Sequence, residues 1–220
     1  MDKAEKLKLI EETGIIAIMR ARHSDHLIAA ADAIHKSGVR VIEVTLNTPH
    51  ALKIIEEARG RYGEEILFGA GTVLDAKSAQ WAISAGAGFI VAPTLNLEMM
   101  AECKRHDLPV IPGCFTPTEM MTAWEAGADM IKLFPADAGG PTLLKSILAP
   151  LSQLKLVPVG GVHLDNAAEF IRNGAVALGV GSSLINPKIL DSGDMAELTR
   201  RAAAFIGKVK EGKEKRSGLN

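Results

Sequence analysis

A lysine within an apolar stretch is the residue of this sequence that most clearly suggests catalytic chemistry. Lys132 lies in the run Met-Ile-Lys-Leu-Phe at 130–134, and an ammonium group is costly to bury without a partner. Burial lowers the pKa of an amine, and a neutral amine can attack a ketone to form a Schiff base. The alternative interpretation is structural: a lysine at a strand end whose charge reaches solvent or pairs with an acid.

A glutamate in a second apolar stretch is the natural counterpart of this lysine. Glu43 lies in Val-Ile-Glu-Val-Thr-Leu at 41–46, where an ionised carboxylate requires a hydrogen bond or an opposite charge. Desolvation raises the pKa of a carboxyl group, which can then act as a general acid and base near neutral pH. A structural salt bridge to Lys132 or Arg20 is the alternative, and it would bring the same groups together.

Other polar residues lie at the ends of the same apolar runs. Arg20 ends the first run. Thr45 and Asn47 alternate with Glu43, so these three side chains would share one side of a strand. They are therefore candidate substrate contacts.

Glycine turns follow the last two apolar runs, and they are Gly160-Gly161 and Gly181-Ser182-Ser183. Their backbone N–H groups, each with a helix N-terminus following, predict a phosphate site. Ordinary tight turns are the alternative. The histidines and cysteines lack the spacing of metal ligands, so neither a metal nor another cofactor is predicted.

The elements that must position these residues repeat along the chain. Eight short runs rich in Ile, Val and Leu occur at 15–19, 41–46, 66–69, 89–92, 109–111, 130–133, 156–159 and 177–180. Stretches with helical spacing lie between them, among them 26–37, 51–61, 76–85, 97–106 and 118–126. This rhythm predicts a (β/α)₈ TIM barrel with an N-terminal helix and an active site at the carboxyl ends of the strands. The competing doubly wound sheet normally has a glycine-rich turn after its first strand, whereas here Arg20-Ala21-Arg22 follows.

Composition limits the class of protein further. The 220 residues are 47% hydrophobic with a formal net charge of −1, which predicts one domain over 1–207 and a polar tail over 208–220. Near-neutral charge and 4% aromatic residues argue against a nucleic-acid surface. Without a membrane-length apolar run or a signal-peptide core, and with two cysteines, a cytoplasmic protein without membrane contact is expected.

Five short motifs occur in order along the chain. They are Glu-Val-Thr-Leu at 43–46, Gly-Ala-Gly-Thr-Val at 69–73, Ile-Pro-Gly at 111–113, Lys-Leu-Phe-Pro-Ala at 132–136 and Gly-Gly-Val at 160–162. The ordered set resembles the class I 2-keto-3-deoxy-6-phosphogluconate (KDPG) and 4-hydroxy-2-oxoglutarate (KHG) aldolase family. The resemblance extends over nearly the whole chain.

This resemblance implies a homotrimeric barrel that cleaves a phosphorylated 2-keto-3-deoxy sugar acid into pyruvate and glyceraldehyde 3-phosphate, and often KHG as well. It implies that Lys132 is the Schiff-base lysine and Glu43 the acid–base residue. It also implies that Thr72 holds the pyruvate portion, and that Pro93 and Phe134 shape its pocket. The residues it assigns to the phosphate are Gly160, Gly161 and Ser183.

One position departs from the gluconate-type pattern. Those members often have arginine two positions after the motif's threonine, and this chain has Asn47. Leu-Asn-Thr-Pro at 46–49 is similar to galactonate-type aldolases, whereas Thr45 is similar to gluconate-type ones. Arg20 would supply the missing positive charge for the substrate carboxylate.

The hypothesis is a metal-independent carbon–carbon lyase that acts on a small molecule. One alternative is another phosphate-binding barrel enzyme, an isomerase or epimerase that uses Glu43 as its base. The other is a catalytically silent phosphosugar-binding protein. The sequence leaves the alternatives and the C4 stereochemistry of the substrate open.

Overall fold

Short strands and helices alternate along the protein. The computed structural model describes residues 1–21 and 26–217. The strands in these residues are β1 (Ile15–Met19), β2 (Val41–Thr45), β3 (Leu67–Gly71), β4 (Ile90–Val91), β5 (Val110–Ile111), β6 (Gly113–Cys114), β7 (Ile131–Leu133), β8 (Leu156–Pro158) and β9 (Leu178–Val180). The helices are α1 (Lys3–Thr13), α2 (Leu27–His35), α3 (Ala51–Tyr62), α4 (Ala76–Ser84), α5 (Leu97–Arg105), α6 (Pro117–Glu125), the 3₁₀ turn η1 (Ala136–Ala138), α7 (Gly140–Leu148), α8 (Leu164–Arg172), α9 (Pro187–Ser192) and α10 (Met195–Ser217).

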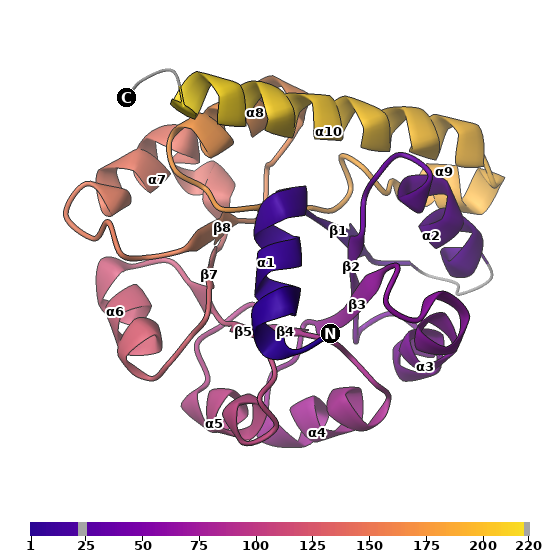
Figure 1. Cartoon of the computed structure of the whole chain (residues 1–220), viewed down its shortest axis with the longest axis horizontal. Coiled ribbons are helices and arrows are strands. Elements are labelled where there is room, and N and C mark those ends of the chain that lie inside the picture. Colours follow the sequence, from indigo (N-terminus) through magenta and orange to yellow (C-terminus); the bar gives the residue numbers. More distant parts are fainter. Residues whose placement is uncertain (22–25, 218–220) are drawn as a thin grey trace.

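The strands are parallel and form a curved layer that the helices surround (Figure 1). One sheet has the order β5-β4-β3-β2-β1-β9 and the other β6-β7-β8. Pro112 separates β5 from β6, and proline has no N–H to donate to a strand ladder. A bridge between Val159 and Gly179 joins the opposite ends of the two sheets. The structure confirms a parallel α/β fold with a curved sheet, although its hydrogen-bonded ladder is divided in two.

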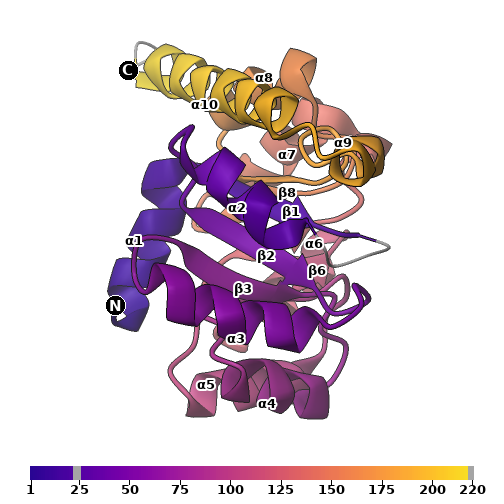
Figure 2. The same ribbon diagram turned by 90° about the vertical axis from the view of Figure 1, so that its right-hand side faces the viewer.

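Two apolar clusters lie on opposite faces of the strands, because successive side chains alternate in direction. The larger packs between strands and helices. The smaller contains the alternate strand residues, such as Ile16 and Val41, together with Leu9 and Ile10 of α1. Figures 1 and 2 show α1 across one end of the strand layer. The helix closes the end at which the strands begin and leaves their carboxyl ends accessible.

Glu43 and Lys132 lie on the same face of their strands as the residues of this smaller cluster. Glu43 lies two positions after Val41 in β2, and Lys132 lies two positions after Met130 in β7. Both side chains therefore belong to the inner face and lie toward the carboxyl ends of their strands.

Several helices begin at the side chains that the sequence pattern favours. Asp75, Asn96 and Thr116 accept backbone N–H groups at the starts of α4, α5 and α6. The helices expected at 51–61, 76–85, 97–106 and 118–126 are found to within one residue at each end. Across residues 1–21 and 26–217, no helix combines the length and apolar character needed to cross a bilayer.

The last helix corrects the expected boundary at residue 207. Instead of a polar tail over 208–220, α10 continues without interruption to Ser217 and lies along α8 (Figure 1). Val209 and Gly212 are buried, and a Cβ at Gly212 would lie 2.6 Å from the carbonyl oxygen of Ala168. The segment is polar because only one stripe of the helix faces the protein, which overall composition does not reveal. Residues 218–220 lie outside the described part.

Candidate active site

A cavity of about 670 Å³ opens at the carboxyl ends of the strands, a size typical of small-molecule sites. Eight residues of the expected site line it, and they are Arg20, Asn47, Phe134, Gly160, Gly161, Gly181, Ser182 and Ser183. They follow β1, β2, β7, β8 and β9. The fold thus brings together residues that are up to 163 positions apart in the sequence.

Lys132 and Glu43 lie on the inner face of the strands, only 6% and 2% exposed respectively. The Nζ atom of Lys132 is 4.8 Å from the ring centroid of Phe134, which lines the cavity. The register of β1 and β2 places Glu43 beside Ile18, another cavity residue. The amine and the acid therefore lie one layer beneath the cavity.

Burial dominates the titration of both groups. Desolvation raises the pKa of the Glu43 carboxyl group, and the positive charges of Lys132 and Arg20 oppose this effect. Desolvation lowers the pKa of the Lys132 amine; the Glu43 charge opposes that change and Arg20 adds to it. The ion pairs within residues 1–21 and 26–217 include none of these three side chains. The structural salt bridge is not formed, and burial shifts the pKa of each group in the direction of its neutral form.

Gly71 makes room for the Glu43 carboxyl group. Glu43 pairs with Gly69 in the register of β2 and β3, and Gly71 is two residues further along β3. A Cβ at Gly71 would lie 1.8 Å from Oε1 of Glu43. The glutamate side chain can lie across β3 only because residue 71 has no side chain. The sequence motif contains Gly71 but does not show this contact, because the two residues are on different strands.

Thr72 and Pro93 follow the neighbouring strands β3 and β4, outside the set of residues that line the cavity. Thr72 has a φ of 57°, a conformation that costs a β-branched residue on the order of 1–3 kcal/mol. The carbonyl oxygen of Pro93 would be 2.4 Å from a Cβ at Gly113. Both residues are half-buried at the carboxyl ends of their strands.

Thr45 is also close to the cavity, but its hydroxyl group is engaged elsewhere. The residue is fully buried, and Oγ1 donates to the carbonyl of Met19 at 3.2 Å. Oγ1 is also 3.2 Å from Oγ1 of Thr48, which accepts the N–H of Ala21 at 3.3 Å. Thr45 and Thr48 thus hold the backbone on both sides of Arg20 rather than lining the cavity. Thr48 is a residue that the sequence interpretation missed.

The two glycine turns lie side by side across the bridge between β8 and β9. Gly160 and Gly161 both have left-handed backbone angles, with φ of 92° and 67°. A Cβ at Gly161 would lie 2.3 Å from Cβ of Asp137, so this turn requires glycine. The amide of Asn166, in the first turn of α8, donates to the carbonyl of Gly161 at 2.9 Å. The helix N-terminus and the backbone N–H groups form a setting suited to an anion.

Comparison with known proteins identifies the family. A family model described as KDPG and KHG aldolase matches residues 7–201. The chain belongs to this family. The aldolase is 35% identical to the 2-dehydro-3-deoxy-phosphogluconate aldolase of Treponema pallidum over 191 residues, which cover 86% of this chain and 90% of the relative. It is also 35% identical to the 2-dehydro-3-deoxy-6-phosphogalactonate aldolase of Escherichia coli K12 over 199 residues, 90% and 95% of the two chains.

A solved structure supports the same assignment. The KDPG aldolase from Legionella pneumophila, with pyruvate captured as a covalent carbinolamine intermediate, superposes with a TM-score of 0.83. It is 27% identical, and the match covers 89% of this chain and 96% of that one. The resemblance inferred from the five motifs is confirmed, and family membership supports a lyase.

Several residues of the aldolase cavity carry no chemical signal in the sequence. They include Ile18, Pro49, Val159, Ile185 and Pro187. Their residue types do not distinguish them from core residues. Among the described residues there is no group of three or more potential metal-binding His, Cys, Asp and Glu side chains. Cys103 and Cys114 are buried, and burial raises the pKa of each thiol to about 12.

Proposed function

We propose that this aldolase cleaves a 2-keto-3-deoxy-6-phospho sugar acid to pyruvate and glyceraldehyde 3-phosphate through a Schiff base on Lys132. The observation that carries the proposal is the buried pair of Lys132 and Glu43 beneath the cavity, each shifted toward its neutral form. The carbinolamine captured in the Legionella relative is the adduct that an amine forms with a ketone. It supports the same chemistry for Lys132.

The reaction begins when the neutral amine of Lys132 attacks the C2 carbonyl of the substrate. Glu43 protonates the hydroxyl group of the carbinolamine, water leaves, and a cationic imine forms beside the new carboxylate. Through a water molecule, Glu43 then takes the C4 hydroxyl proton as the electron pair of the C3–C4 bond moves toward the imine and the aldehyde leaves. Glu43 returns a proton to C3 of the enamine, and water releases pyruvate from the lysine.

The remaining residues hold the substrate. Arg20 pairs with the substrate carboxylate, and Asn47 contacts its polar chain from the neighbouring loop. Thr72, Pro93 and Phe134 enclose the pyruvate portion. Thr45 acts through the backbone that carries Arg20, since its hydroxyl group is bonded to Met19. The residues that bind phosphate in this proposal are Gly160, Gly161, Gly181, Ser182 and Ser183.

Both C4 epimers are candidate substrates, because the gluconate-type and galactonate-type relatives are equally similar to this chain. KHG is a third candidate, and it lacks the phosphate. Turnover of all three, measured by coupling pyruvate release to lactate dehydrogenase, ranks them directly. We expect the phosphorylated acids to have lower KM values than KHG, because only they use the glycine turns.

The proposal includes four properties of the whole protein. The two sheets complete one eight-stranded barrel, which with the N-terminal helix makes a single domain. The active protein is a homotrimer, a state that light scattering after size-exclusion chromatography measures. It acts in the cytoplasm, and it needs no metal or other cofactor, so dialysis against a chelator should leave turnover unchanged.

Borohydride trapping tests the chemistry. Treatment with pyruvate and borohydride should increase the mass of the peptide that contains Lys132. Lys132→Met should abolish both the adduct and turnover, whereas Lys145→Met, on the exposed side of α7, should leave both unchanged. An unmodified Lys132 peptide contradicts the Schiff-base mechanism. Turnover that survives Lys132→Met favours an isomerase or epimerase, and an adduct without turnover of any candidate favours a binding protein.

A further inference from the structure

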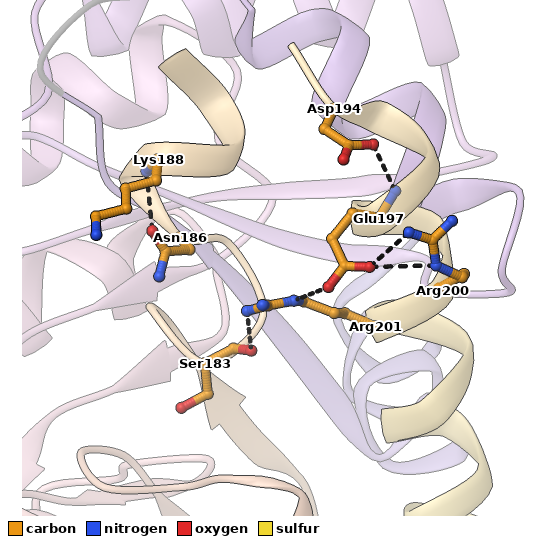
Figure 3. A network of polar contacts seen from close by, with 7 residues as sticks. All are labelled: Ser183, Asn186, Lys188, Asp194, Glu197, Arg200 and Arg201. Atoms are coloured by element: carbon orange, nitrogen blue, oxygen red, sulfur yellow. Dashed lines mark hydrogen bonds and ion pairs between the residues drawn. The ribbon is translucent and has the colours of Figure 1, made fainter. Parts of the chain in front are cut away.

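The glycine–serine turn after β9 is held from outside the cavity by an arginine of the C-terminal helix. Nη1 of Arg201 donates to the carbonyl oxygen of Ser183 at 3.4 Å. Nε of the same guanidinium group donates to Oε1 of Glu197 at 2.8 Å. Figure 3 shows Arg201 extending from α10 to the backbone of Ser183, with Glu197 beside it. Arg201 does not line the cavity.

The internal hydrogen bonds of this turn leave specific donors available. The N–H groups of Leu184 and Ile185 both donate to the carbonyl of Gly181, at 2.9 and 2.8 Å. Within the described part of the chain, no backbone partner is found for the N–H groups of Ser182 and Ser183. Both residues line the cavity. Among the described residues, the turn therefore has two N–H groups without a backbone partner, and Arg201 holds the carbonyl of Ser183.

The first turns of α10, which carry Arg201, are fixed by hydrogen bonds and by burial. The N–H of Glu197 donates to Asp194 Oδ1 at 2.9 Å, which caps the first turn of α10. The hydroxyl group of Ser37, just after α2, donates to the carbonyl of Thr199 at 2.8 Å. Ala202, the next residue after Arg201, is fully buried. A side chain fixed at both ends loses little additional freedom when the phosphate binds, which is the condition for preorganised recognition.

The arginines of this network stabilise the charged form of Glu197. Glu197 accepts hydrogen bonds from Arg201 and also from Arg200, whose Nη2 is 2.8 Å from Oε2. These two guanidinium groups, Arg201 first, hold the pKa of Glu197 below its usual value. The carboxylates of Glu197 and Asp194 together balance the charges of Arg200 and Arg201, so Arg201 acts on the turn through its hydrogen bond to Ser183.

We propose that Arg201, held by Glu197, is a positioning residue for recognition of the substrate phosphate. This inference rests on the proposed function, because the substrate phosphate is the group that the turn would bind. Arg201 acts by fixing the Ser183 carbonyl, so that the Ser182 and Ser183 N–H groups are already in place when the phosphate arrives. It has no part in the chemistry at Lys132.

The experiment compares Arg201→Met with Arg200→Met. The control residue shares Glu197 but makes no contact with Ser183 among its hydrogen bonds in the described structure. For Arg201→Met, the KM for the phosphorylated acid and the inhibition constant of inorganic phosphate should each rise about tenfold, the effect of losing one charge-assisted hydrogen bond. The pyruvate concentration that half-saturates borohydride trapping at Lys132 should not change. Arg200→Met should leave all three values within about twofold of the wild type.

Two further variants separate positioning from folding. Arg201→Lys keeps the charge and should recover part of the affinity for phosphate that Arg201→Met loses. Glu197→Gln leaves Arg201 in place but removes the charge of its hydrogen-bond partner. This variant should raise the KM for the phosphorylated acid and the inhibition constant of phosphate about threefold. If Arg201→Met matches Arg200→Met, or if pyruvate half-saturation rises as much as the phosphate constants, the inference is wrong. A wild-type protein that forms the pyruvate adduct but is not inhibited by phosphate would instead disprove the phosphate site, and the positioning role with it. Absence of the adduct in the wild type identifies a failure of the proposed chemistry.

Discussion

Gly71→Ala should impair catalysis far more than it impairs folding. A methyl group at this position of β3 would lie 1.8 Å from Oε1, 2.4 Å from Cδ and 2.6 Å from Cγ of Glu43. The backbone at residue 71 does not have a left-handed φ, so alanine fits the strand itself. The whole conflict is therefore with the glutamate side chain, and the carboxyl group must move away from its present place.

The size of the movement sets the size of the effect. Ordinary contact begins at 3.4 Å, so the carboxyl oxygen must move by roughly 1.5 Å, and a displacement of this order costs on the order of a hundredfold in rate. Lys132 is on β7, in a different sheet from Gly71 and Glu43, so its amine should keep its position. We expect kcat for cleavage to fall about 100-fold, while pyruvate still forms a borohydride-trapped adduct on Lys132, only more slowly.

Gly69→Ala is the matched control, because Gly69 is two positions earlier on the same strand. There a Cβ would lie 2.5 Å from the Phe89 ring, deeper in the inner cluster. That variant should lower the melting temperature but change kcat by less than about threefold, since overpacking in the core acts on stability. The assays are pyruvate release coupled to lactate dehydrogenase and thermal unfolding. A Gly71→Ala protein with kcat within threefold of the wild type, or a Gly69→Ala protein with an equal loss of kcat, would refute the assigned role of Gly71.

The pH dependence of imine formation should shift in opposite directions in two variants. The charge of Glu43 raises the pKa of Lys132, and the charge of Arg20 lowers it. Because the amine reacts only above its pKa, Glu43→Gln should move the acidic limit of cyanoborohydride trapping with pyruvate to lower pH, and Arg20→Met should move it to higher pH. Shifts in the same direction would contradict the assigned electrostatics. In α10, Gly212→Ala should destabilise the protein by about 1–3 kcal/mol because the new methyl group meets α8. A Cβ at Gly207 meets open space, so Gly207→Ala should stabilise the protein by about 0.5–1 kcal/mol. Equal melting temperatures for the two variants would show that residues beyond 207 do not contribute to the fold.

The buried pair of Lys132 and Glu43 was predictable from sequence because a charge within a strand is anomalous. Glu43 and Lys132 each interrupt an apolar run, and the alternation of side chains then assigns both to the inner face. Their parallel strands bring both to the same end of the sheet, as the structure shows. The structural salt bridge could not be dismissed in this way, because it depends on distances between strands that are far apart in sequence.

Other parts of the site depend on contacts that residue types do not encode. Thr45 has the right spacing for a substrate contact, but Met19 and Thr48 take its hydroxyl group. Arg201 lies on a helix whose composition is typical of a solvated surface, and only the return of that helix to the turn after β9 brings it to Ser183. The boundary at residue 207 failed for the same reason, since a narrow buried stripe on a polar helix resembles a tail.

In the proposed function, the arrangement separates the chemistry from the choice of substrate. Lys132 and Glu43 lie within strands and beneath the cavity, where burial sets their pKa values. The cavity above them is lined mainly by loops after β1, β2, β8 and β9, which can change sequence without disturbing the strand interior. Asn47 is in one of these loops, so its departure from the gluconate-type pattern need not alter the amine or the acid. Exchange of Asn47 for arginine should therefore change the preference between the two C4 epimers while trapping of pyruvate at Lys132 stays the same, because pyruvate carries neither the C4 hydroxyl group nor the phosphate.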